Sequence, residues 1–397
     1  MNILYITTVF PEHKDTSTIY TDLAEELGKI HNVTVVTNIE RNKKQKTYIS
    51  EERNCLVLRV KTGNQYNVNI IEKGLTLITI DFLLIRAIKK YFKGSNFDLI
   101  LYESPPVTLS NVVKYAKRKY KSRTFLMLKD IFPQNAVDLG IFKRNSLLYR
   151  YFRLKERELY NISDKIGCMS KGNLEYINKH NNINMDKLTI FPNTKKYKKT
   201  ISFFRDQSIL SKYNIPHNKV LFVFGGNMGK PQGIDFLGDC IVQSQDIEEA
   251  FFVLVGRGTE KYKLKHKLKK AKNAIVLDSL PRDDYELLLQ NCDVGIICLD
   301  YRFTIPNYPS RILSYMEYKK PVLALTDEAT DFKNLVLESN CGMWSPSNSI
   351  ESFKNNVLKL LNKDLRDFQG ENGYNYFLNN FLVDKSVNIL NTYLKEK

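Results

Sequence analysis

One segment of the chain combines several glycines with a basic residue in a way that could hold a phosphate group. It runs from Phe224 to Asp235, reads FGGNMGKPQGID, and directly follows an apolar run typical of a buried strand. Glycines let a backbone approach a ligand closely, the helix that follows offers free amide groups, and Lys230 adds a positive charge. These features suit a diphosphate. The spacing is not GxGxxG, so a glycine-rich turn without a ligand is the alternative.

A second segment, Ile305–Arg311, joins the apolar run Val294–Cys298 to a helix that we predict over Ile312–Glu317. Ser310 is a residue type that caps helices, and the guanidinium of Arg311 can bind phosphate oxygens with two parallel hydrogen bonds. Two such anion sites on one rim could hold both phosphates of a diphosphate. The alternative is that Arg311 is a solvated charge next to a proline-built turn.

A carboxylate follows a strand in the N-terminal half, where the apolar run Thr124–Leu128 leads into Asp130. A carboxylate at a strand end could accept a proton from a hydroxyl group or orient a sugar, provided that it lies within hydrogen-bond reach. The alternative is an aspartate that caps the following helix. The first loop, Thr8–Thr18, is long and polar, which fits contact with a second substrate.

These loops are positioned by short apolar strands that alternate with amphipathic helices, the pattern of a parallel sheet covered on both faces. The pattern restarts at Val220 after a polar, charged stretch that suits a hinge. Ligands of such sheets bind beyond the carboxyl ends of the strands, so two sheets facing each other would create one deep cleft. The predicted strands are Ile3–Ile6, Val33–Thr37, Leu56–Val60, Leu99–Tyr102, Thr124–Leu128, Lys165–Cys168, Val220–Phe224, Phe251–Val255, Ala274–Leu277, Val294–Cys298 and Val322–Leu325.

The composition narrows the class of protein. The 397 residues, 43% of them hydrophobic, suffice for two or three domains. A formal net charge of +17 favours a polyanionic partner, which could be nucleic acid, an acidic lipid surface or a diphosphate. No nucleic acid partner is expected, because the sequence lacks zinc-finger spacing, an RNP-type aromatic motif and a long basic tail. Six scattered cysteines predict reduced core residues of a cytoplasmic protein, and neither a secretory signal nor a bilayer-spanning run is recognisable.

Several short motifs occur in a characteristic order: Glu103–Pro106, Asp130–Pro133, Gly167–Asn173, Phe191–Asn193, Gly225–Asp235 and Pro309–Arg311. In this combination the chain resembles glycosyltransferase family 4 over nearly its whole length, and within that family the capsule and O-antigen enzymes similar to N-acetyl-L-fucosamine transferases. The resemblance implies the α/β GT-B fold of two Rossmann-like, doubly wound domains. It also implies a nucleotide-sugar donor in the C-terminal domain, an acceptor in the N-terminal domain, retention of anomeric configuration, and no metal or other cofactor.

The resemblance assigns roles by position. The predicted catalytic residues are Asp130, Lys230 and Arg311. The predicted donor-binding residues are Gly226, Asn227, Gly229, Gln232, Gly256, Arg257, Leu280, Pro281, Ser310, Ser314 and Glu317, and the predicted acceptor-binding residues are Thr16, Ser17 and Ser104. The family's paired glutamates correspond here to Pro306 and Ser314, so Glu317 would contact the ribose only with a shift in register. The double glycine usual in the first loop is replaced by Thr16–Thr18.

The implied function is that of a retaining glycosyltransferase that moves a sugar, an N-acetylated deoxyhexosamine, from a UDP-sugar to a lipid-linked glycan in capsular or O-antigen polysaccharide synthesis. Residues 1–192 would form the acceptor domain, 193–215 a hinge and 216–379 the donor domain, with a C-terminal helix at about 380–397 packing back on the first domain. Two alternatives are a non-hydrolysing UDP-sugar 2-epimerase and a non-catalytic partner subunit of an active transferase.

The basic charge also suits an anionic membrane surface. The segment Ile70–Phe92 ends in several cations and could lie on such a surface, although an ordinary amphipathic surface helix explains it equally well. The predicted location is therefore the cytoplasm, with peripheral binding to the inner face of the cell membrane as a hypothesis.

Overall fold

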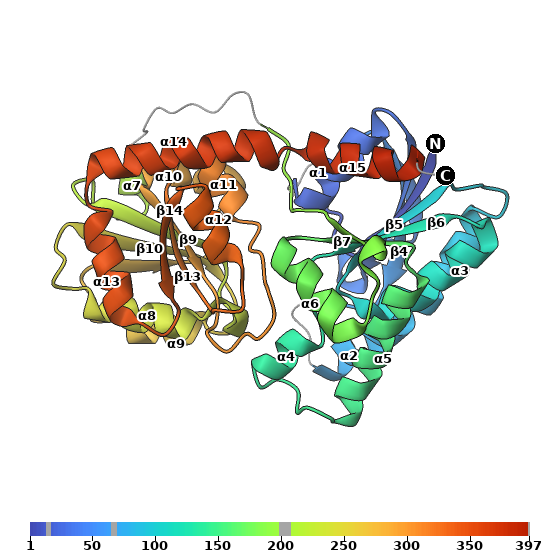
Figure 1. The fold of residues 1–397 in the computed structure, drawn as a ribbon, viewed down its shortest axis with the longest axis horizontal. Coiled ribbons are helices and arrows are strands. Elements are labelled where there is room, and N and C mark those ends of the chain that lie inside the picture. Colours follow the sequence, from blue (N-terminus) through green and yellow to red (C-terminus); the bar gives the residue numbers. More distant parts are fainter. Residues whose placement is uncertain (13–16, 65–69, 198–207, 396–397) are drawn as a thin grey trace. The chain divides into compact units, whose positions relative to one another are not determined.

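The computed structural model of the chain describes residues 1–12, 17–64, 70–197 and 208–395 (Figure 1). The chain folds into two compact units. Unit 1 comprises Met1–Lys196 and Val383–Lys397, and unit 2 comprises Tyr197–Leu382. The C-terminal segment of the chain therefore belongs to unit 1, together with the N-terminal segment.

Unit 1 is built on an eight-stranded sheet with the order β3-β4-β2-β1-β5-β6-β7-β8. Neighbouring strands are parallel except for β3, which pairs with β4 in antiparallel fashion. Parallel strands covered on both faces are continuous apolar runs, and Ile3–Ile6 of β1 is such a run, fully buried. The strands are β1 (Asn2–Ile6), β2 (Asn32–Glu40), β3 (Tyr48–Glu52), β4 (Cys55–Thr62), β5 (Leu99–Ser104), β6 (Arg123–Leu128), β7 (Lys165–Cys168) and β8 (Leu188–Ile190).

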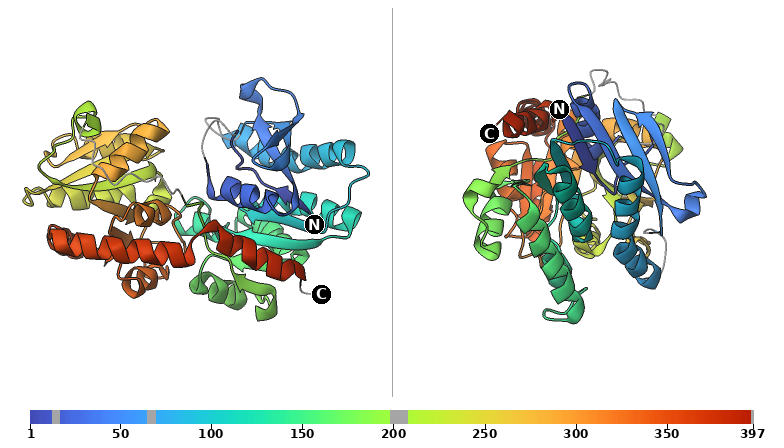
Figure 2. Two further views of the ribbon diagram at one scale, coloured as in Figure 1. Left: turned by 90° about the horizontal axis from the view of Figure 1, so that it is seen from above. Right: turned by 90° about the vertical axis from the view of Figure 1, so that its right-hand side faces the viewer.

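Helices cover both faces of this sheet (Figures 1 and 2). On one face α1 packs against α15, and on the other α2, α3 and α5 lie side by side. Several helices begin at a side-chain cap, because Thr18, Ser146 and Ser170 each accept a hydrogen bond from the amide three residues on. The helices of unit 1 are α1 (Ile19–Gly28), α2 (Ile70–Tyr91), α3 (Ser110–Tyr120), α4 (Gln134–Asp138), α5 (Leu147–Ile162), α6 (Lys171–Asn181) and α15 (Val383–Lys395), with short 3-10 turns η1 (Arg41–Lys43), η2 (Val107–Leu109) and η3 (Met185–Lys187).

The last helix, α15, completes the core of unit 1. Its residues Val387, Leu390 and Tyr393 are buried in one cluster with side chains of α1 and of the central strands. The Tyr393 hydroxyl donates to the carbonyl oxygen of Thr124 at 3.3 Å. The amide of Val383 donates to the carbonyl oxygen of Lys195 at 3.0 Å, so the chain leaves unit 1 and returns to it at one place.

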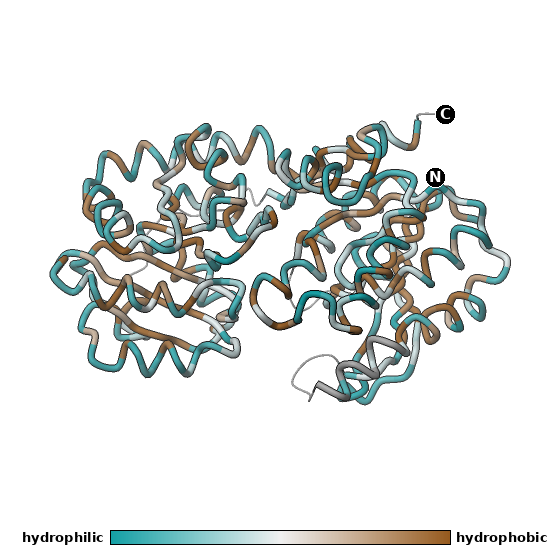
Figure 3. Tube along the Cα trace, turned by 60° about the horizontal axis from the view of Figure 1, so that its bottom comes forward, coloured by the Kyte–Doolittle hydropathy of each residue, from teal (hydrophilic) through white to brown (hydrophobic). Residues whose placement is uncertain are grey.

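Unit 2 is a six-stranded, wholly parallel sheet with the order β11-β10-β9-β12-β13-β14. Figure 3 shows hydrophobic stretches along the strands and alternating hydrophobic and hydrophilic stretches along the outer helices. The strands are β9 (Val220–Asn227), β10 (Ala250–Arg257), β11 (Ala274–Leu277), β12 (Val294–Cys298), β13 (Val322–Thr326) and β14 (Gly342–Pro346). The helices are α7 (Ser208–Lys212), α8 (Ile234–Gln243), α9 (Lys261–Lys267), α10 (Arg282–Asn291), α11 (Ile312–Glu317), α12 (Phe332–Glu338), α13 (Ile350–Lys359) and α14 (Lys363–Asn380), with the 3-10 turn η4 (Lys230–Gln232).

The predicted fold class of two doubly wound, mostly parallel units is confirmed, and every predicted strand is present. The sequence did not reveal β3, β8, β14 or the long helix α14. Of the predicted hinge at 193–215, residues 198–207 lie outside the described residues, and Ser208–Lys212 form α7 of unit 2. All six cysteines are buried and free, as the sequence indicated.

The segment Ile70–Phe92 forms α2. Ile80, Leu84 and Ile88 are fully buried in unit 1, as in an ordinary amphipathic helix, whereas Phe82 on the same helix is 65% exposed. Contact of this segment with a membrane surface stays a prediction. Within the described part of the chain, no helix has the length and apolar character that crossing a bilayer requires.

Candidate functional site

The glycine-rich segment of unit 2 forms the turn between β9 and α8, at the carboxyl end of the central strand. Its register pairs Gly226 with Gly256 on β10. Gly226 has a φ of +131° and Gly256 a φ of +155°, values that other residues rarely adopt. A Cβ atom on Gly256 would overlap the carbonyl oxygen of Gly226, so the two strand ends approach as closely as glycine permits.

One side chain holds the turn in shape. The Gln232 Oε1 atom accepts hydrogen bonds from the Asn227 side-chain amide at 3.0 Å and from the Gly229 amide at 3.2 Å. Met228 is fixed from the β10 side, since its amide donates to the carbonyl oxygen of Arg257 at 2.8 Å. The turn is therefore a preorganised loop, while Gly226 and Asn227 remain exposed to solvent.

Arg311 lies directly against this turn. A Cβ atom on Gly226 would stand 2.7 Å from Nη2 of Arg311, and the guanidinium carbon is 4.5 Å from the centroid of the Phe224 ring. Arg311 is half-buried, and no carboxylate of the described residues forms an ion pair with it. A guanidinium held this way keeps its charge available to an anion on the exposed side of the loop.

Two tyrosines, Tyr285 and Tyr315, lie within electrostatic reach of Arg311, and no sequence pattern indicated them. The Tyr315 hydroxyl donates towards the carbonyl oxygens of Val223 and Ile296, each at 3.2 Å. The Tyr285 hydroxyl fills the space beside Gly225, where any side chain would collide with it. Burial raises the pKa of both phenols, so both stay neutral next to the guanidinium.

The predicted cap at Ser310 is wrong. The residue that precedes α11 as its cap is Arg311, whose backbone is already helical and whose side chain accepts no hydrogen bond from the first turn. Ser310 instead contributes its carbonyl oxygen, to which the amide of Leu313 donates at 3.2 Å. Ser310 itself is exposed and Ser314 is half-buried one turn after it.

Glu317 does not lie in the turn that holds Arg311. Its side chain is fully buried, on a helix that packs against α14. A contact with a bound ribose would require this part of unit 2 to rearrange.

Lys230 is exposed on η4, at the rim of a cavity of about 420 Å³. The first residues of α8 also line this cavity, and no side chain caps that helix, so its leading amides can meet an anion. Three of the four carboxylates that line the cavity pair with cations: Asp300 with Arg302 at 2.8 Å, Asp235 with Lys267 at 2.7 Å and Asp239 with Lys267 at 2.6 Å. The fourth, Glu260, forms no ion pair among the described residues. No ion pair engages Lys230 within the described ranges.

The other predicted donor residues lie on neighbouring strand ends of unit 2. Arg257 ends β10 and is exposed, while Leu280 and Pro281 lie between β11 and α10. Pro281 is the residue from which α10 starts, and its carbonyl oxygen accepts from the amide of Tyr285 at 2.9 Å. The side chains that the structure brings into contact are thus those of the β9 turn and Arg311.

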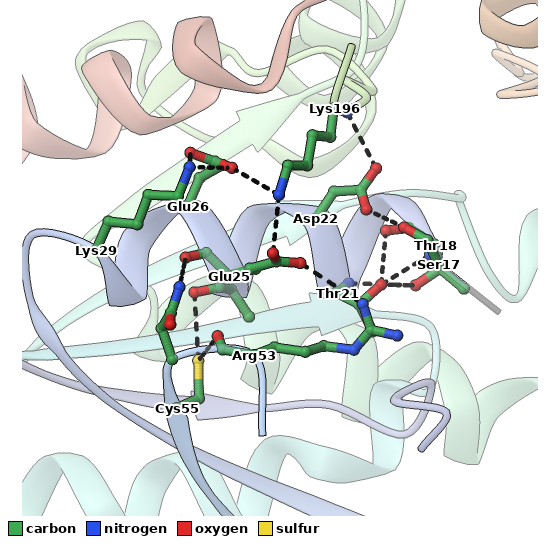
Figure 4. Close-up of polar contacts among 12 residues, drawn as sticks. Ser17, Thr18, Thr21, Asp22, Glu25, Glu26, Lys29, Arg53, Cys55 and Lys196 are labelled. Carbon is green, nitrogen blue, oxygen red and sulfur yellow. Dashed lines mark hydrogen bonds and ion pairs between the residues drawn. The ribbon is translucent and has the colours of Figure 1, made fainter. Parts of the chain in front are cut away.

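In unit 1 the first loop is tied down at its end by Asp22, whose side chain is buried (Figure 4). One oxygen of Asp22 accepts from the Ser17 hydroxyl, and the other accepts from the amide of Lys196 at 3.0 Å. The Lys196 ammonium also pairs with Glu25 at 2.8 Å and Glu26 at 3.3 Å. The Asp22 carboxylate therefore links the first loop to Lys196, the last residue of the N-terminal segment of unit 1. Thr16 lies outside the described residues.

The start of the first loop is held by a second buried carboxylate, Glu103, at the end of β5. Its Oε1 accepts from the Thr7 hydroxyl at 2.8 Å and from the Thr8 amide at 2.9 Å, while Oε2 is buried with no partner among the described residues. Burial raises the pKa of Glu103 to about 7 and lowers the pKa of Lys129, on the adjoining strand end, to about 7. Ser104 is also enclosed, at 1% exposure, so a substrate does not reach its hydroxyl directly.

Asp130 follows β6 beside these groups and is half-buried. It accepts hydrogen bonds from the Ile131 amide at 2.8 Å and from the Asn135 side chain at 2.6 Å. Pro133, not Asp130, precedes α4, so the alternative of a helix cap does not hold. Burial raises the pKa of Asp130 to about 6, which leaves it mostly ionised at neutral pH.

These arrangements suit anion binding in unit 2 and proton or hydroxyl chemistry in unit 1. Fixed cations and amide dipoles beside a phosphate lower the barrier to breaking a bond that leaves negative charge on it. Across the described residues, no group of three or more histidines, cysteines and carboxylates is arranged to hold a metal ion.

Comparison with known proteins agrees with this geometry. The two parallel-sheet units define the GT-B fold of glycosyltransferases. Residues 206–376 match the family model described as "Glycosyl transferases group 1". The chain is 23% identical over 308 residues to the probable glycosyltransferase WbjE of Pseudomonas aeruginosa, covering 76% of this chain and 75% of WbjE.

Two solved structures are similar over almost the whole chain. WaaG, a glycosyltransferase involved in lipopolysaccharide biosynthesis, superposes with a TM-score of 0.66 at 16% identity, covering 98% of this chain and 99% of WaaG. Anabaena Alr3699/HepE in complex with UDP superposes with a TM-score of 0.69 at 14% identity, covering 99% of each chain. Together these findings support a glycosyltransferase of the GT-B fold.

Proposed function

We propose that the protein is a retaining glycosyltransferase that takes a sugar from a UDP-sugar and passes it to a lipid-linked glycan in the synthesis of a capsular or O-antigen polysaccharide. The observation that carries the proposal is Arg311 lying against the glycine turn of β9, inside the region that matches the group 1 glycosyl transferases. The UDP complex of the Anabaena relative and the lipopolysaccharide role of WaaG support the donor and the product class.

In this proposal unit 2 holds the donor. Arg311 and Lys230 bind the diphosphate and stabilise the charge that builds up on it as the sugar departs. The exposed backbone of Gly226 and Asn227 lies next to the phosphates, with Gly229 and Gln232 fixing the turn. Arg257, Gly256, Leu280 and Pro281 line the nucleoside, and Ser310 and Ser314 border the ribose.

Unit 1 binds the acceptor. Asp130 accepts a hydrogen bond from the acceptor, or its proton, and its elevated pKa fits that task better than an ordinary aspartate would. Ser17 contacts the acceptor from the first loop, which Glu103 and Asp22 hold at its two ends. The enclosed Ser104 does not contact the acceptor directly but shapes the carboxyl end of β5. The transferred sugar is proposed to be an N-acetylated deoxyhexosamine.

A lipid-linked acceptor would lie at a membrane, so we also propose that the protein works in the cytoplasm, bound peripherally to the inner face of the cell membrane. The net charge of +17 supports attraction to anionic lipid.

Calorimetry with UDP tests the donor site first. We expect binding in the wild type and a loss of roughly 10- to 100-fold in affinity in Arg311→Ala, because a charge-assisted contact is removed. Lys354→Ala, which removes a cation of the same unit paired with Asp246, should bind UDP normally. Absence of UDP binding in the wild type would point to a non-catalytic partner subunit.

Release of UDP from a panel of UDP-sugars then tests the reaction. A transferase releases UDP only when a lipid-linked acceptor is added, and the sugar becomes attached to that acceptor with its anomeric configuration retained. Interconversion of UDP-sugars without any acceptor would instead identify a 2-epimerase and overturn the proposal.

A further inference from the structure

The first two turns of α5 expose an unusual number of apolar side chains. The inner face of this helix is ordinary, with Phe152, Leu159 and Tyr160 buried in unit 1. The outer face is also apolar, although it meets solvent. Its exposed fractions are Leu147 84%, Leu148 51%, Tyr151 39% and Leu154 56%, and Ile141 in the preceding turn is 56% exposed.

The spacing gathers these side chains into one stripe. Leu147, Tyr151 and Leu154 follow one another at four and three residues, so they lie one above the other on one side of the helix. Single exposed leucines are common on protein surfaces, but apolar side chains clustered on one face mark an interaction site. Figures 1 and 2 show that this end of α5 projects beyond the neighbouring ends of α2 and α3 within unit 1.

The charged residues within the segment that carries the stripe are all basic. No aspartate or glutamate occurs from Leu139 to Lys155. Lys143, Arg144 and Arg150 are exposed there, and among the described residues none of these three takes part in an ion pair. The acidic residues that bound this segment are engaged: Asp138 accepts a hydrogen bond from the Gln134 side chain at 2.7 Å, and Glu156 and Glu158 pair with cations of the same helix.

We propose that this surface docks on an anionic lipid bilayer. The α5 tip, as we define it, comprises Ile141, Lys143, Arg144, Leu147, Leu148, Arg150, Tyr151 and Leu154. Apolar side chains flanked by unpaired cations are what an interfacial helix offers, because the apolar groups enter the boundary of the acyl chains while the cations meet lipid phosphates. A projecting helix end can enter a bilayer without a complementary groove. The inference rests on the proposed function to the extent that a lipid-linked acceptor requires a membrane.

Co-sedimentation of the full chain with vesicles tests the α5 tip. We expect binding to vesicles of phosphatidylglycerol and phosphatidylcholine, much weaker binding to phosphatidylcholine alone, and release at high salt. Lys143→Gln/Arg144→Gln/Arg150→Gln should weaken binding roughly 100-fold, since each cation near an anionic surface contributes several-fold. Leu147→Ser/Leu148→Ser/Leu154→Ser should weaken it at least roughly tenfold through the loss of apolar burial.

Matched controls separate the α5 tip from the overall charge. Lys269→Gln/Lys270→Gln/Lys359→Gln removes three exposed lysines of unit 2 and should leave vesicle binding within about twofold of the wild type. An equal loss in this control and in the tip variant would overturn the proposal, because the net charge alone would then account for binding. So would a dimer in solution that the leucine variant converts to a monomer, since the stripe would then be covered by a second copy.

Binding of UDP distinguishes failure of this inference from failure of the proposed function. One outcome is that the chain does not bind UDP but still binds vesicles through the α5 tip. This outcome supports the docking surface and contradicts the proposed transferase. The opposite outcome is that the wild type binds UDP and transfers sugar to a short water-soluble acceptor, while both tip variants bind vesicles as the wild type does. This outcome supports the transferase and refutes the docking surface.

Discussion

The approach of Arg311 to Gly226 leads to the sharpest prediction. Replacing Gly226 by alanine adds one methyl group at a place where the Arg311 Nη2 atom would be 2.7 Å away and the guanidinium carbon 3.3 Å away. Unbonded heavy atoms settle at about 3.5–4.0 Å, so the guanidinium must shift by about 1 Å. The substitution therefore moves the proposed phosphate ligand without changing any charge.

Two effects of this substitution can be estimated. The φ of +131° at Gly226 is strained for alanine and costs about 1–3 kcal/mol. For a unit of this size a loss of about 2 kcal/mol lowers the Tm by about 4–8 °C. The displaced guanidinium loses a charge-assisted contact worth about 1.5–3 kcal/mol, so the Kd for UDP should rise roughly 10- to 100-fold.

Calorimetry with UDP and a thermal unfolding scan measure the two effects separately. Gly94→Ala is the matched control, because a methyl group at Gly94 meets nothing within 4 Å and its backbone is not in the left-handed region. Arg311→Lys, which keeps the charge but lacks the planar fork, gives a second route if Gly226→Ala proves too unstable, with an expected rise of roughly tenfold in Kd. A Gly226→Ala protein that folds and binds UDP as the wild type does would refute the assignment of Arg311 to the diphosphate.

Two further predictions concern the buried carboxylates of unit 1. If the ionised form of Asp130 serves the acceptor, the rate of transfer should rise with pH through about 6, and Asp130→Asn should lower the rate roughly 100-fold and abolish this limb of the pH profile. A profile that keeps the limb in Asp130→Asn would assign it to another group. Burial raises the pKa of Glu103 in the folded protein from its ordinary value of 4.5 to about 7, so its contribution to stability is complete below pH 4.5 and is lost as the pH rises through 7. The free energy of unfolding of Glu103→Gln, measured with urea, should therefore rise relative to that of the wild type by roughly 2–3 kcal/mol between pH 4.5 and pH 8. A difference between the two proteins that is constant with pH would contradict the raised pKa.

The strands that could be predicted from the sequence are those covered on both faces of the sheet, because burial on both faces requires apolar residues. The central strands of both sheets are unbroken apolar runs and were all recognised. β3 was missed because it is an edge strand with polar residues, YISEE, that alternate between half-buried and exposed. β14 was missed because it ends in a proline and contains a glycine, both unusual in strands.

The site was predictable to the extent that it follows from strand ends. Because β9 and the segment before α11 both lead to the carboxyl edge of one parallel sheet, the glycine turn and Arg311 were expected near each other, and the structure brings them into contact. Ser310 failed as a cap because the helical backbone already begins at Arg311. Tyr285 and Tyr315 support the site from within the fold, which no local pattern reveals.

The α5 tip could not have been found from sequence. Apolar residues at helical spacing indicate a face that packs inward, and Leu147 and Leu154 read in the same way as Phe152 and Leu159. The exposed fraction of each side chain decides between core and surface, and that fraction depends on what the rest of unit 1 places against the helix.

The position of α15 has a consequence for how the protein is made. Unit 1 lacks part of its core until Val387, Leu390 and Tyr393 have been added, and these residues emerge from the ribosome after all of unit 2. The N-terminal half must therefore wait, incompletely folded, while the second half is translated, contrary to the usual order in which the first domain finishes first. For the same reason, a fragment that stops at the end of the first sheet would need the final helix supplied as a separate peptide or by fusion.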